Sequence, residues 1–253
     1  MDLQLQGKNV LITGGSKGIG KAIAKVFLTE GANVAIAARS VDFLKKAKEE
    51  LGDGVTIFQS DITKTEEREK LIRSFVEKKG SIDILVNNAG GSNGGTVIET
   101  DLDLFHVAME LNYFSAVHLS KLAVEQMKKN GSGAIINITS IFGRESGGKV
   151  TYNNAKAALI SFTKSLADEV IRYGIRVNSV APGSILHDTG NWKKRMEESP
   201  EKIKAFVENE IPAGRFGAVE EVANVVAFLA SEKASWIVGA SLNVDGGQSR
   251  MNF

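Results

Sequence analysis

The sequence contains no cysteine, only 3 prolines and no excess of either charge, with 31 Lys and Arg against 30 Asp and Glu in 253 residues. Without cysteine, disulfides and thiolate metal sites are excluded. A net charge of +1 gives no broad attraction for nucleic acid or an anionic membrane, so any phosphate recognition must be local. We therefore expect a small-molecule partner, and neither a nucleic acid nor a membrane.

Long apolar runs are also lacking. The apolar stretch 134–141 is interrupted by Asn137, Thr139 and Ser140, and no stretch approaches the roughly 18 residues of a membrane span. Residues 1–8 lack the charged, apolar and small-residue regions of a secretory signal. The histidines, at positions 106, 118 and 187, are too scattered for a recognisable metal motif. We expect a cytoplasmic protein without a catalytic metal.

Short β-rich runs alternate with longer segments of helical period, which is typical of a parallel sheet with crossover helices. The expected strands are 9–13, 33–37, 55–59, 82–86, 134–139, 176–180 and 241–244. The expected helices are 18–30, 41–51, 64–79, 102–129, 150–172, 200–209 and 219–231. No repeat or linker divides the chain. The sequence predicts a single α/β domain over 1–253, a doubly wound, Rossmann-type, seven-stranded parallel sheet with helices on both faces and ligands beyond the carboxyl ends of its strands.

A glycine-rich loop, residues 13–20, follows the first expected strand and leads directly into a helix. Its glycines let the backbone approach a pyrophosphate, and the helix N-terminus favours an anion. The spacing Gly-x-x-x-Gly-x-Gly differs from the G-x-G-x-x-G dinucleotide fingerprint, and the alternative is an ordinary strand-to-helix turn. The loop residues expected to bind a cofactor are Gly14, Ser16, Lys17, Gly18, Ile19 and Gly20.

The end of the second strand bears on which nicotinamide dinucleotide binds. NAD sites usually have an acid there for the ribose 2′-hydroxyl, whereas an arginine suits the 2′-phosphate of NADP. Here the strand ends Ala37-Ala38-Arg39-Ser40, with no acid, and Lys17 adds a second cation. Lys17 alone is equally consistent with a solvated surface charge. Together with the missing acid, the two cations predict NADP (NADPH) as cofactor, with Arg39 and Ser40 among its ligands.

Tyr152 and Lys156 lie four residues apart and therefore on one face of a helix. A tyrosine ordinarily has a pKa of about 10. We expect the ammonium of Lys156 to lower that pKa so that Tyr152 exchanges a proton with a substrate oxygen. Ser140 follows the fifth strand, where its hydroxyl could hold the carbonyl, although it could instead cap a turn. Asn112 is an amide inside an amphipathic helix, bonded to a backbone group or water unless it faces the surface.

These residues, with Asn87-Asn88-Ala89-Gly90, Pro182-Gly183 and the ending 242–247, resemble the short-chain dehydrogenase/reductase family from Gly7 to Gly247. The resemblance implies a catalytic tetrad of Asn112, Ser140, Tyr152 and Lys156. Lys156 would also hold the nicotinamide ribose, and Asn112 would support a proton-relay water. The resemblance further implies cofactor contacts from Asp61 and Ile62 at the adenine, from Asn88, Ala89 and Gly90, from Pro182, Gly183 and Ile185 around the nicotinamide, and from Tyr152 and Lys156.

Two positions depart from the family pattern. The family often has a threonine five residues after the proline of the Pro-Gly pair, where this chain has His187. The interval from Ser140 to Tyr152 is one residue shorter than in many relatives, so the loop 143–150 shapes the pocket differently. Both changes affect the expected pocket, and neither removes a catalytic group.

The resemblance implies that NADPH reduces a ketone or aldehyde with Tyr152 as general acid. The first substrate expectation is a 3-oxoacyl thioester linked to a carrier protein or coenzyme A, and the alternative is a sugar, polyol or other secondary alcohol. A catalytically idle NADP-binding regulatory protein would be expected to lose a tetrad member. An enzyme of dehydration or epimerisation would usually have a longer segment after Pro182. Substrate identity, stereochemistry and direction do not follow from one sequence.

The segment 185–213 is expected to act as a substrate-binding lid. Its Trp192 is as consistent with a packing anchor as with a substrate contact, and its basic cluster 193–195 is more typical of a solvated face. Relatives with the same C-terminal ending include tetramers, so the resemblance implies a homotetramer in which the helices 102–129 and 150–172 pair. A carrier protein would favour basic residues near the active-site mouth, and Lys128, Lys129 and Arg172 are the candidates.

Overall fold

The computed structural model describes residues 2–252, so the terminal residues of the expected 1–253 domain lie outside it. Within these residues, seven parallel strands form the main sheet, in the order β3-β2-β1-β4-β5-β6-β9. They are β1 (Asn9–Thr13), β2 (Asn33–Ala38), β3 (Thr56–Gln59), β4 (Ile84–Asn87), β5 (Gly133–Ile138), β6 (Ile175–Pro182) and β9 (Ser241–Val244). The expected fold class, a doubly wound seven-stranded parallel sheet, is confirmed.

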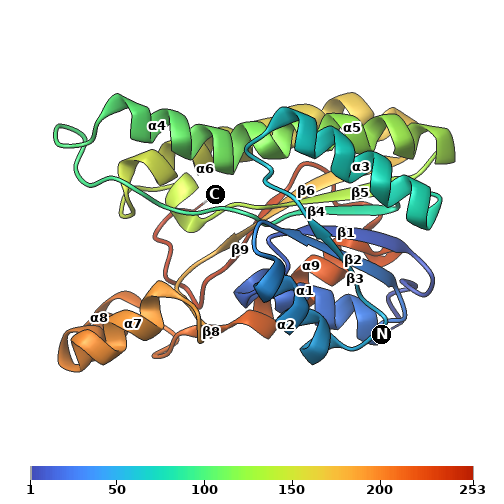
Figure 1. Ribbon diagram of the computed structural model, residues 1–253. Coiled ribbons are helices and arrows are strands. Elements are labelled where there is room, and N and C mark those ends of the chain that lie inside the picture. Colours follow the sequence, from blue (N-terminus) through green and yellow to red (C-terminus); the bar gives the residue numbers. More distant parts are fainter. Residues whose placement is uncertain (1, 253) are drawn as a thin grey trace.

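Helices cover both faces of the sheet (Figure 1). The helices α1 (Gly18–Thr29), α2 (Val41–Leu51) and α9 (Val219–Ala230) lie on one face. The helices α3 (Thr65–Lys79), α4 (Leu102–Met109), α5 (Ser115–Asn130) and α6 (Val150–Val170) lie on the other. Val10 and Ile12 of β1 pack into the first core and Leu11 into the second, because successive side chains of a strand point to opposite faces.

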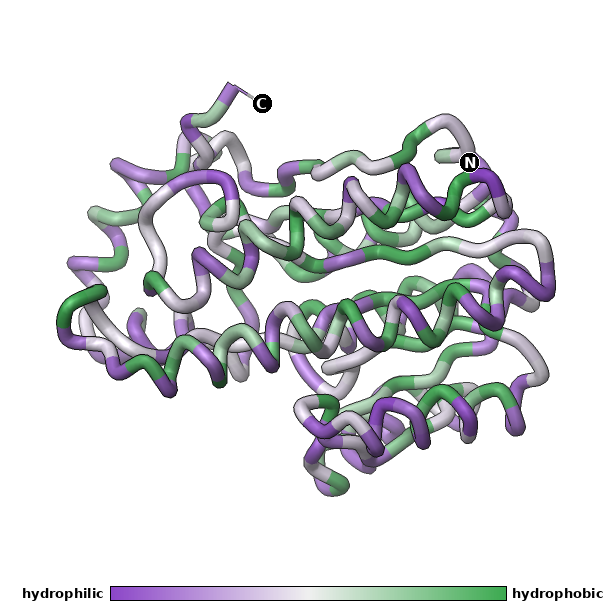
Figure 2. Tube along the Cα trace, turned by 90° about the horizontal axis from the view of Figure 1, so that it is seen from above, coloured by the Kyte–Doolittle hydropathy of each residue, from purple (hydrophilic) through white to green (hydrophobic). Residues whose placement is uncertain are grey.

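The helices are amphipathic. In Figure 2 each long helix alternates between hydrophilic and hydrophobic colours along its length, as expected when one side packs on the sheet and the other faces water. Among the described residues, no helix combines the length and the apolar character that crossing a membrane requires.

The chain order reverses beside β1. This strand pairs with β2 on one side, at Val10↔Val34, and with β4 on the other, at Val10↔Ile84. Loops leaving the carboxyl ends of β1 and β4 therefore diverge to opposite faces of the sheet, and open α/β sheets bind ligands in the resulting crevice. The topology places the glycine-rich loop, which follows β1, at this point.

The last strand, β9, lies at the edge of the sheet beside β6, with Ser179 opposite Ser241. The segments that follow the two strands also contact each other. The Gly183 amide donates to the Val244 carbonyl at 3.1 Å, and the Ser184 amide donates to Oε1 of Gln248 at 2.7 Å. The C-terminal residues thus hold the loop that leaves β6.

A smaller unit projects from the sheet after β6 (Figure 1). The short strands β7 (Ile185–Leu186) and β8 (Gly217–Ala218) pair with each other, and α7 (Asn191–Glu198) and α8 (Pro200–Glu210) lie between them in the chain. The expected helix 200–209 is found as α8, with proline at its first position, where the missing N–H is harmless. The helix α7 was not expected, and it buries none of its residues.

The helix expected over 102–129 is interrupted. A π-helical turn, η1 (Glu110–Phe114), joins α4 to α5 and contains Asn112. Single π-helical turns are rare and are often found at functional sites. The expected helix 150–172 likewise ends at Val170 and continues as a 3₁₀ turn, η3 (Ile171–Tyr173).

Candidate active site

A cleft of about 1610 Å³ opens at the carboxyl ends of β1, β4, β5 and β6, between the body of the protein and the helices α7 and α8. Ligand pockets are typically about 300–1,000 Å³, so this cleft has room for a dinucleotide and a second molecule. All the residues expected to bind the cofactor line it, namely Gly14, Ser16, Lys17, Gly18, Ile19, Gly20, Arg39, Ser40, Asp61, Ile62, Asn88, Ala89, Gly90, Tyr152, Lys156, Pro182, Gly183 and Ile185.

The glycine-rich loop is held against the segment after β4. Nδ2 of Asn88 donates to the carbonyl oxygens of Thr13 and Gly14 at 3.0 and 3.2 Å, and Oγ1 of Thr13 accepts from the amides of Asn88 and Ala89. Gly14 has φ +66°, and a Cβ there would lie only 2.9 Å from Asn88 Nδ2. The glycine therefore permits both the backbone conformation and the close approach of the two loops.

The helix α1 begins at Gly18, so its first amide groups lie at the cleft without partners inside the helix. Such a terminus favours an anion, both through these amides and through the helix dipole. The backbone of the loop is therefore suited to a pyrophosphate.

Two cations lie beside this loop. Arg39 is exposed at the end of β2, and Nζ of Lys17 lies over the ring of Phe43, 2.9 Å from its centroid. Burial and the nearby charge of Lys46 lower the pKa of Lys17. Neither Lys17 nor Arg39 has a partner among the ion pairs of residues 2–252. Both charges are thus available to an anionic ligand in the cleft.

Asp61 lies near Arg39, on the same side of the cleft. Burial alone would raise the pKa of Asp61, but hydrogen bonds from Thr63 and the charge of Arg39 outweigh that effect and lower it. Oδ1 of Asp61 accepts from Oγ1 of Thr63 at 2.8 Å and from its amide at 3.2 Å. Asp61 is therefore ionised at neutral pH and already engaged by its own turn.

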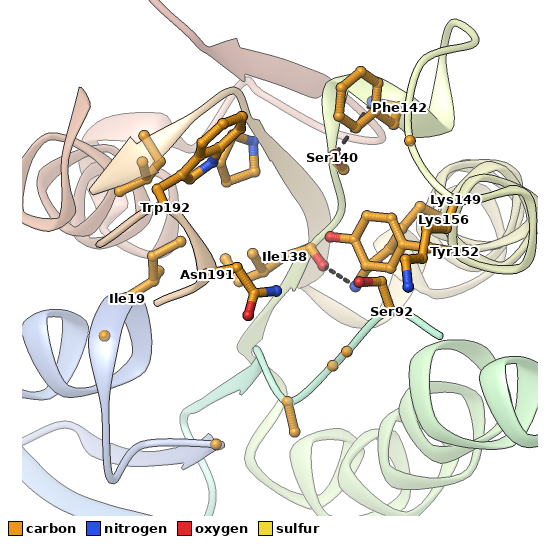
Figure 3. Close-up of a pocket in the computed structure, with 18 of the residues that line it drawn as sticks. Ile19, Ser92, Ile138, Ser140, Phe142, Lys149, Tyr152, Lys156, Asn191 and Trp192 are labelled. Atoms are coloured by element: carbon orange, nitrogen blue, oxygen red, sulfur yellow. Dashed lines mark hydrogen bonds between the residues drawn. The ribbon is translucent and has the colours of Figure 1, made fainter. Parts of the chain in front are cut away.

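Ser140, Tyr152 and Lys156 line the cleft together (Figure 3). Ser140 follows β5, and its Oγ accepts from the Phe142 amide at 3.2 Å, so it also caps the short turn η2 (Ile141–Gly143). Tyr152 and Lys156 come from the first turns of α6, with the Lys156 Nζ 5.4 Å from the centroid of the tyrosine ring. This Nζ donates to the Ile138 carbonyl at 2.8 Å. The three functional groups thus converge from the end of β5 and the start of α6.

The pKa values of this group differ from the sequence-based expectation. Burial raises the pKa of Tyr152, and a hydrogen bond with Ser140 offsets this only in part. Burial lowers the pKa of Lys156 to about 8. The expectation that the pKa of Tyr152 lies below its usual value is wrong for this structure, because the effect of burial on the phenol outweighs that of its polar neighbours. Tyr152 is therefore protonated at neutral pH and suited to donate a proton.

Asn112 lies behind the cleft wall and does not line the cleft. It is 1% exposed, so the surface-facing alternative is wrong. Its Oδ1 accepts from the Gly91 amide at 3.0 Å, and its Nδ2 donates to the carbonyls of Gly91 and Ala108, both at 2.9 Å. A Cβ at Gly90 would lie 2.7 Å from Asn112 Oδ1 and 3.3 Å from Lys156 Nζ. Asn112 thus holds the 90–91 backbone next to Lys156, and its role with a relay water stays a prediction.

The model of the family described as enoyl-(acyl carrier protein) reductase matches residues 14–249. The chain belongs to the short-chain dehydrogenase/reductase family. The 3-oxoacyl-[acyl-carrier-protein] reductase FabG of Vibrio cholerae is 38% identical over 97% of this chain and 98% of that protein. An uncharacterized oxidoreductase of Thermotoga maritima is also 38% identical, over 98% and 99%. These matches make the chain an oxidoreductase of this family.

A solved structure agrees over the full fold. The L-sorbose reductase of Gluconobacter frateurii, complexed with NADPH and L-sorbose, is similar with a TM-score of 0.92 and 36% identity, covering 99% of this chain and 100% of the other. The short-chain dehydrogenase/reductase fold is therefore shared from end to end.

His187 replaces the threonine that the family often has at this position. It is half-buried in the cleft, and its Cε1 lies 2.9 Å from where a Cβ of Gly18 would be. Its Nδ1 is 3.2 Å from Oγ1 of Thr189, and burial lowers its pKa. The imidazole therefore lies over the start of α1. The departure from the family pattern was the only signal for this residue in the sequence.

Further residues line the cleft that were not among the expected catalytic and cofactor-binding residues. Trp192 stacks on Phe206 at 4.7 Å between centroids and so anchors α7 on α8, and it also borders the cleft, where a substrate contact stays a prediction. The further lining residues include Ser92, Lys149, Asn191, Arg195, Lys202 and Phe206. Asn191, Arg195, Lys202 and Phe206 lie in the segment 185–213 that was expected to hold the substrate, although nothing in their spacing separates them from their neighbours.

The basic residues proposed for carrier docking lie elsewhere. Lys128 and Lys129 end α5 just before β5 begins at Gly133, and Arg172 precedes β6 in the same way. The cleft is at the opposite, carboxyl ends of these strands. Lys128 and Arg172 instead contact the ring of Tyr173, at 4.3 and 4.9 Å. The expectation that they lie near the active-site mouth of the same chain is wrong.

Within residues 2–252, no three His, Asp or Glu side chains gather as metal ligands would.

Proposed function

We propose that this protein is an NADP(H)-dependent carbonyl reductase that converts a ketone or aldehyde to an alcohol. The observation that supports it most is the convergence of Ser140, Tyr152 and Lys156 in one cleft with the glycine-rich loop, Lys17 and Arg39. A catalytically idle nucleotide sensor would have no need for a protonated phenol beside a serine hydroxyl. Relatives of similar length include reductases, one of them solved with NADPH.

The residues present fit a dinucleotide. Asn88 holds the glycine-rich loop in place, and α1 begins beside the cleft at Gly18, where its first amides would contact a pyrophosphate. Arg39 and Lys17 would hold the 2′-phosphate, since a guanidinium presents a planar fork of donors and an ammonium a point charge. Lys156 has N–H donors beyond the one used by Ile138, and these would hold the nicotinamide ribose.

When bound, NADPH supplies the hydride that the carbonyl carbon receives. Burial keeps the phenol of Tyr152 protonated. Tyr152 therefore donates its proton to the carbonyl oxygen as that oxygen gains negative charge and becomes more basic. The Ser140 hydroxyl donates a hydrogen bond to the same oxygen and orients it. Lys156, charged below about pH 8, stabilises the phenolate that remains. The same groups run the reverse oxidation when alcohol is in excess.

We propose two classes of substrate. A 3-oxoacyl thioester is favoured by the many carrier-protein reductases among the relatives. A sugar or polyol is favoured by the similarity to L-sorbose reductase and by the polar side chains Ser92 and Asn191 in the cleft. Figure 3 shows Asn191 and Trp192 on the side of the pocket opposite Tyr152, where a substrate held by the segment 185–213 would lie.

The test is consumption of NADPH and NADH at 340 nm with 3-oxoacyl thioesters, keto-sugars, diketones and quinones. We expect Tyr152→Phe to lower kcat by about 10²–10⁴-fold, the usual range for loss of a general acid. The matched control, Tyr173→Phe, changes a tyrosine at the other end of the sheet and should leave kcat unchanged. Binding of NADPH without consumption by any substrate would instead favour the idle sensor.

The cofactor assignment is tested separately. Arg39→Ala should weaken NADPH binding by about tenfold or more and leave NADH binding unaffected, because a charge-assisted contact to the 2′-phosphate is lost. The control is Arg73→Ala, an exposed arginine of α3 outside the cleft. Tighter binding of NADH than NADPH by the unaltered protein would contradict the roles given to Arg39 and Lys17.

We also propose that the protein is a homotetramer and that it acts in the cytoplasm. Exposed apolar side chains support self-association at two places. Val107 and Phe114 are 55% and 48% exposed on the α4–α5 surface, and Trp236 and Leu242 are 97% and 43% exposed beside the edge strand β9. Light scattering of the purified protein measures the assembly directly, and a monomer at micromolar concentration would contradict this proposal.

A further inference from the structure

The helices α7 and α8 present one continuous side to the cleft. Within each helix the lining residues fall on one face, since those that are not adjacent are three or four residues apart: Asn191, Trp192, Arg195 and Glu198 in α7, and Lys202, Ile203 and Phe206 in α8. Trp192 and Phe206 stack on each other and both contact Phe216, with centroids 4.7 to 6.4 Å apart. This aromatic cluster joins the two helices and fixes which side chains face the cleft.

Two cations lie on this face. Arg195 and Lys202 both line the cleft, whereas their basic neighbours Lys193, Lys194 and Lys204 do not. The Arg195 guanidinium lies 5.0 Å from the Trp192 ring, which fixes its position near the aromatic cluster. In the described part of the chain, neither Arg195 nor Lys202 takes part in an ion pair.

Two acids line the same part of the cleft. Glu198 lines the same face but pairs with Lys194 at 3.7 Å, and Glu99 across the cleft accepts from Thr96 Oγ1 at 2.6 Å. Lys149 adds a third cation, on the side of the pocket near Tyr152 (Figure 3). The part of the cleft away from the glycine-rich loop therefore has more positive than negative charge to offer.

We propose that Arg195 and Lys202 bind a phosphate group on the substrate, so that the enzyme acts on a phosphorylated carbonyl compound. A phosphate carries close to two negative charges at neutral pH and accepts both the fork of an arginine and the point charge of a lysine. The inference rests on the proposed reductase function and deepens it, by naming the charge of the substrate. The phosphate has two sources, a sugar phosphate or the phosphate-bearing arm of a coenzyme A or carrier-protein thioester.

The test uses two pairs of probes that differ in the phosphate. One pair is L-sorbose 1-phosphate and L-sorbose, and the other is acetoacetyl-4′-phosphopantetheine and acetoacetyl-pantetheine, so that the members of each pair differ only by the phosphate. The first readout is kcat/KM with NADPH. The second is binding followed by Trp192 fluorescence in a Trp236→Phe background, which leaves Trp192 as the only tryptophan. Saturating NADP⁺ keeps the phosphorylated probes out of the cofactor site.

In at least one pair we expect the phosphorylated member to exceed the neutral member by about tenfold or more in kcat/KM and in affinity, as a charge-assisted contact gives. The pair that shows the preference identifies the source of the phosphate. The double variant R195Q/K202Q should lose the preference and leave the neutral member unchanged. The matched control, K193Q/K204Q, removes one exposed lysine from each helix outside the cleft and should keep the preference.

Equal values for both members of both pairs would overturn the proposal, as would a preference that persists in R195Q/K202Q. Failure of the reductase function is distinguishable. If no carbonyl is reduced but the Trp192 signal still favours the phosphorylated probes, the reductase function is wrong and the phosphate site stands. If carbonyls are reduced without any preference for the phosphorylated probes, the reductase function stands and the phosphate site is wrong.

Discussion

Replacing Lys156 with methionine is expected to stabilise the folded chain at neutral pH while abolishing activity. Lys156 is 3% exposed, and burial lowers its pKa from 10.5 to about 8. At about 1.4 kcal/mol for each pH unit, the buried ammonium is about 3 kcal/mol less favourable in the folded than in the unfolded chain. Methionine removes that contribution but leaves the Ile138 carbonyl without its donor, which costs about 1–3 kcal/mol. The net gain is about 0–2 kcal/mol.

The pH dependence is the sharper measurement. In the wild-type protein the ammonium loses its proton near pH 8 when folded and near 10.5 when unfolded. Between these values the unfolded chain binds more protons, so stability rises with pH. The unfavourable contribution of Lys156 is complete below pH 8 and vanishes above 10.5. Relative to Lys156→Met, the wild-type free energy of unfolding should therefore increase by about 2 kcal/mol between pH 7 and pH 9.5.

Urea unfolding followed by circular dichroism, without nucleotide and at fixed protein concentration, measures this difference. The matched control is Lys164→Met, which removes a 59% exposed lysine from the same helix α6. Its difference from wild type should not change with pH in this range. A difference between wild type and Lys156→Met that stays constant from pH 7 to 9.5 would refute the reasoning.

Two further substitutions test buried polar groups. The guanidinium of Arg176 donates to the carbonyls of residues 229–231 and 234 at 2.7–3.2 Å. Arg176→Met should therefore lower the free energy of unfolding by about 3–5 kcal/mol. A loss below about 1 kcal/mol in urea unfolding would contradict this. Asn112→Ala frees both backbone groups of Gly91 and should lower stability by about 1–3 kcal/mol and speed amide exchange at Gly91. Unchanged exchange there would show that the side chain does not hold this loop.

Most of the sheet is predictable from the sequence because its strands are buried on both faces and form short apolar runs. β1 matches its prediction, and β9 does as well. β4 begins at Ile84 and not at Ile82, since Ile82 is buried but lies before the pairing with β1 begins. For this strand the predicted burial is correct, but the hydrogen-bonded part of the strand is shorter than the predicted run.

Helix irregularities were not predictable. The π-helical turn η1 depends on side-chain and backbone bonds around Asn112, and the amphipathic period continues through it. The helix α7 buries no residue, so no apolar period reveals it. The paired strands β7 and β8 have two residues each, which is too few for any alternation to appear.

The site residues were predictable where chemistry depends on spacing or strand ends. Tyr152 and Lys156 share a helix face, and Ser140 and Gly14 follow strands whose carboxyl ends meet at the cleft. The pKa values were not predictable, because they depend on burial and on the direction in which Lys156 points. Arg195 and Lys202 were hidden among other basic residues, and only the packing of α7 on α8 separates them from their neighbours.

The position of β9 beside β6 has a consequence for folding of the chain during its synthesis on the ribosome. The sheet's last strand in chain order is the only described neighbour of β6 on that side, and Gln248 holds the amide of Ser184. A nascent chain that ends before residue 241 therefore exposes an unpaired β6 edge, a template for pairing with other chains. The cleft is completed only when the final segment of the sheet has emerged. Premature termination should thus yield an aggregating product and not a weakened enzyme.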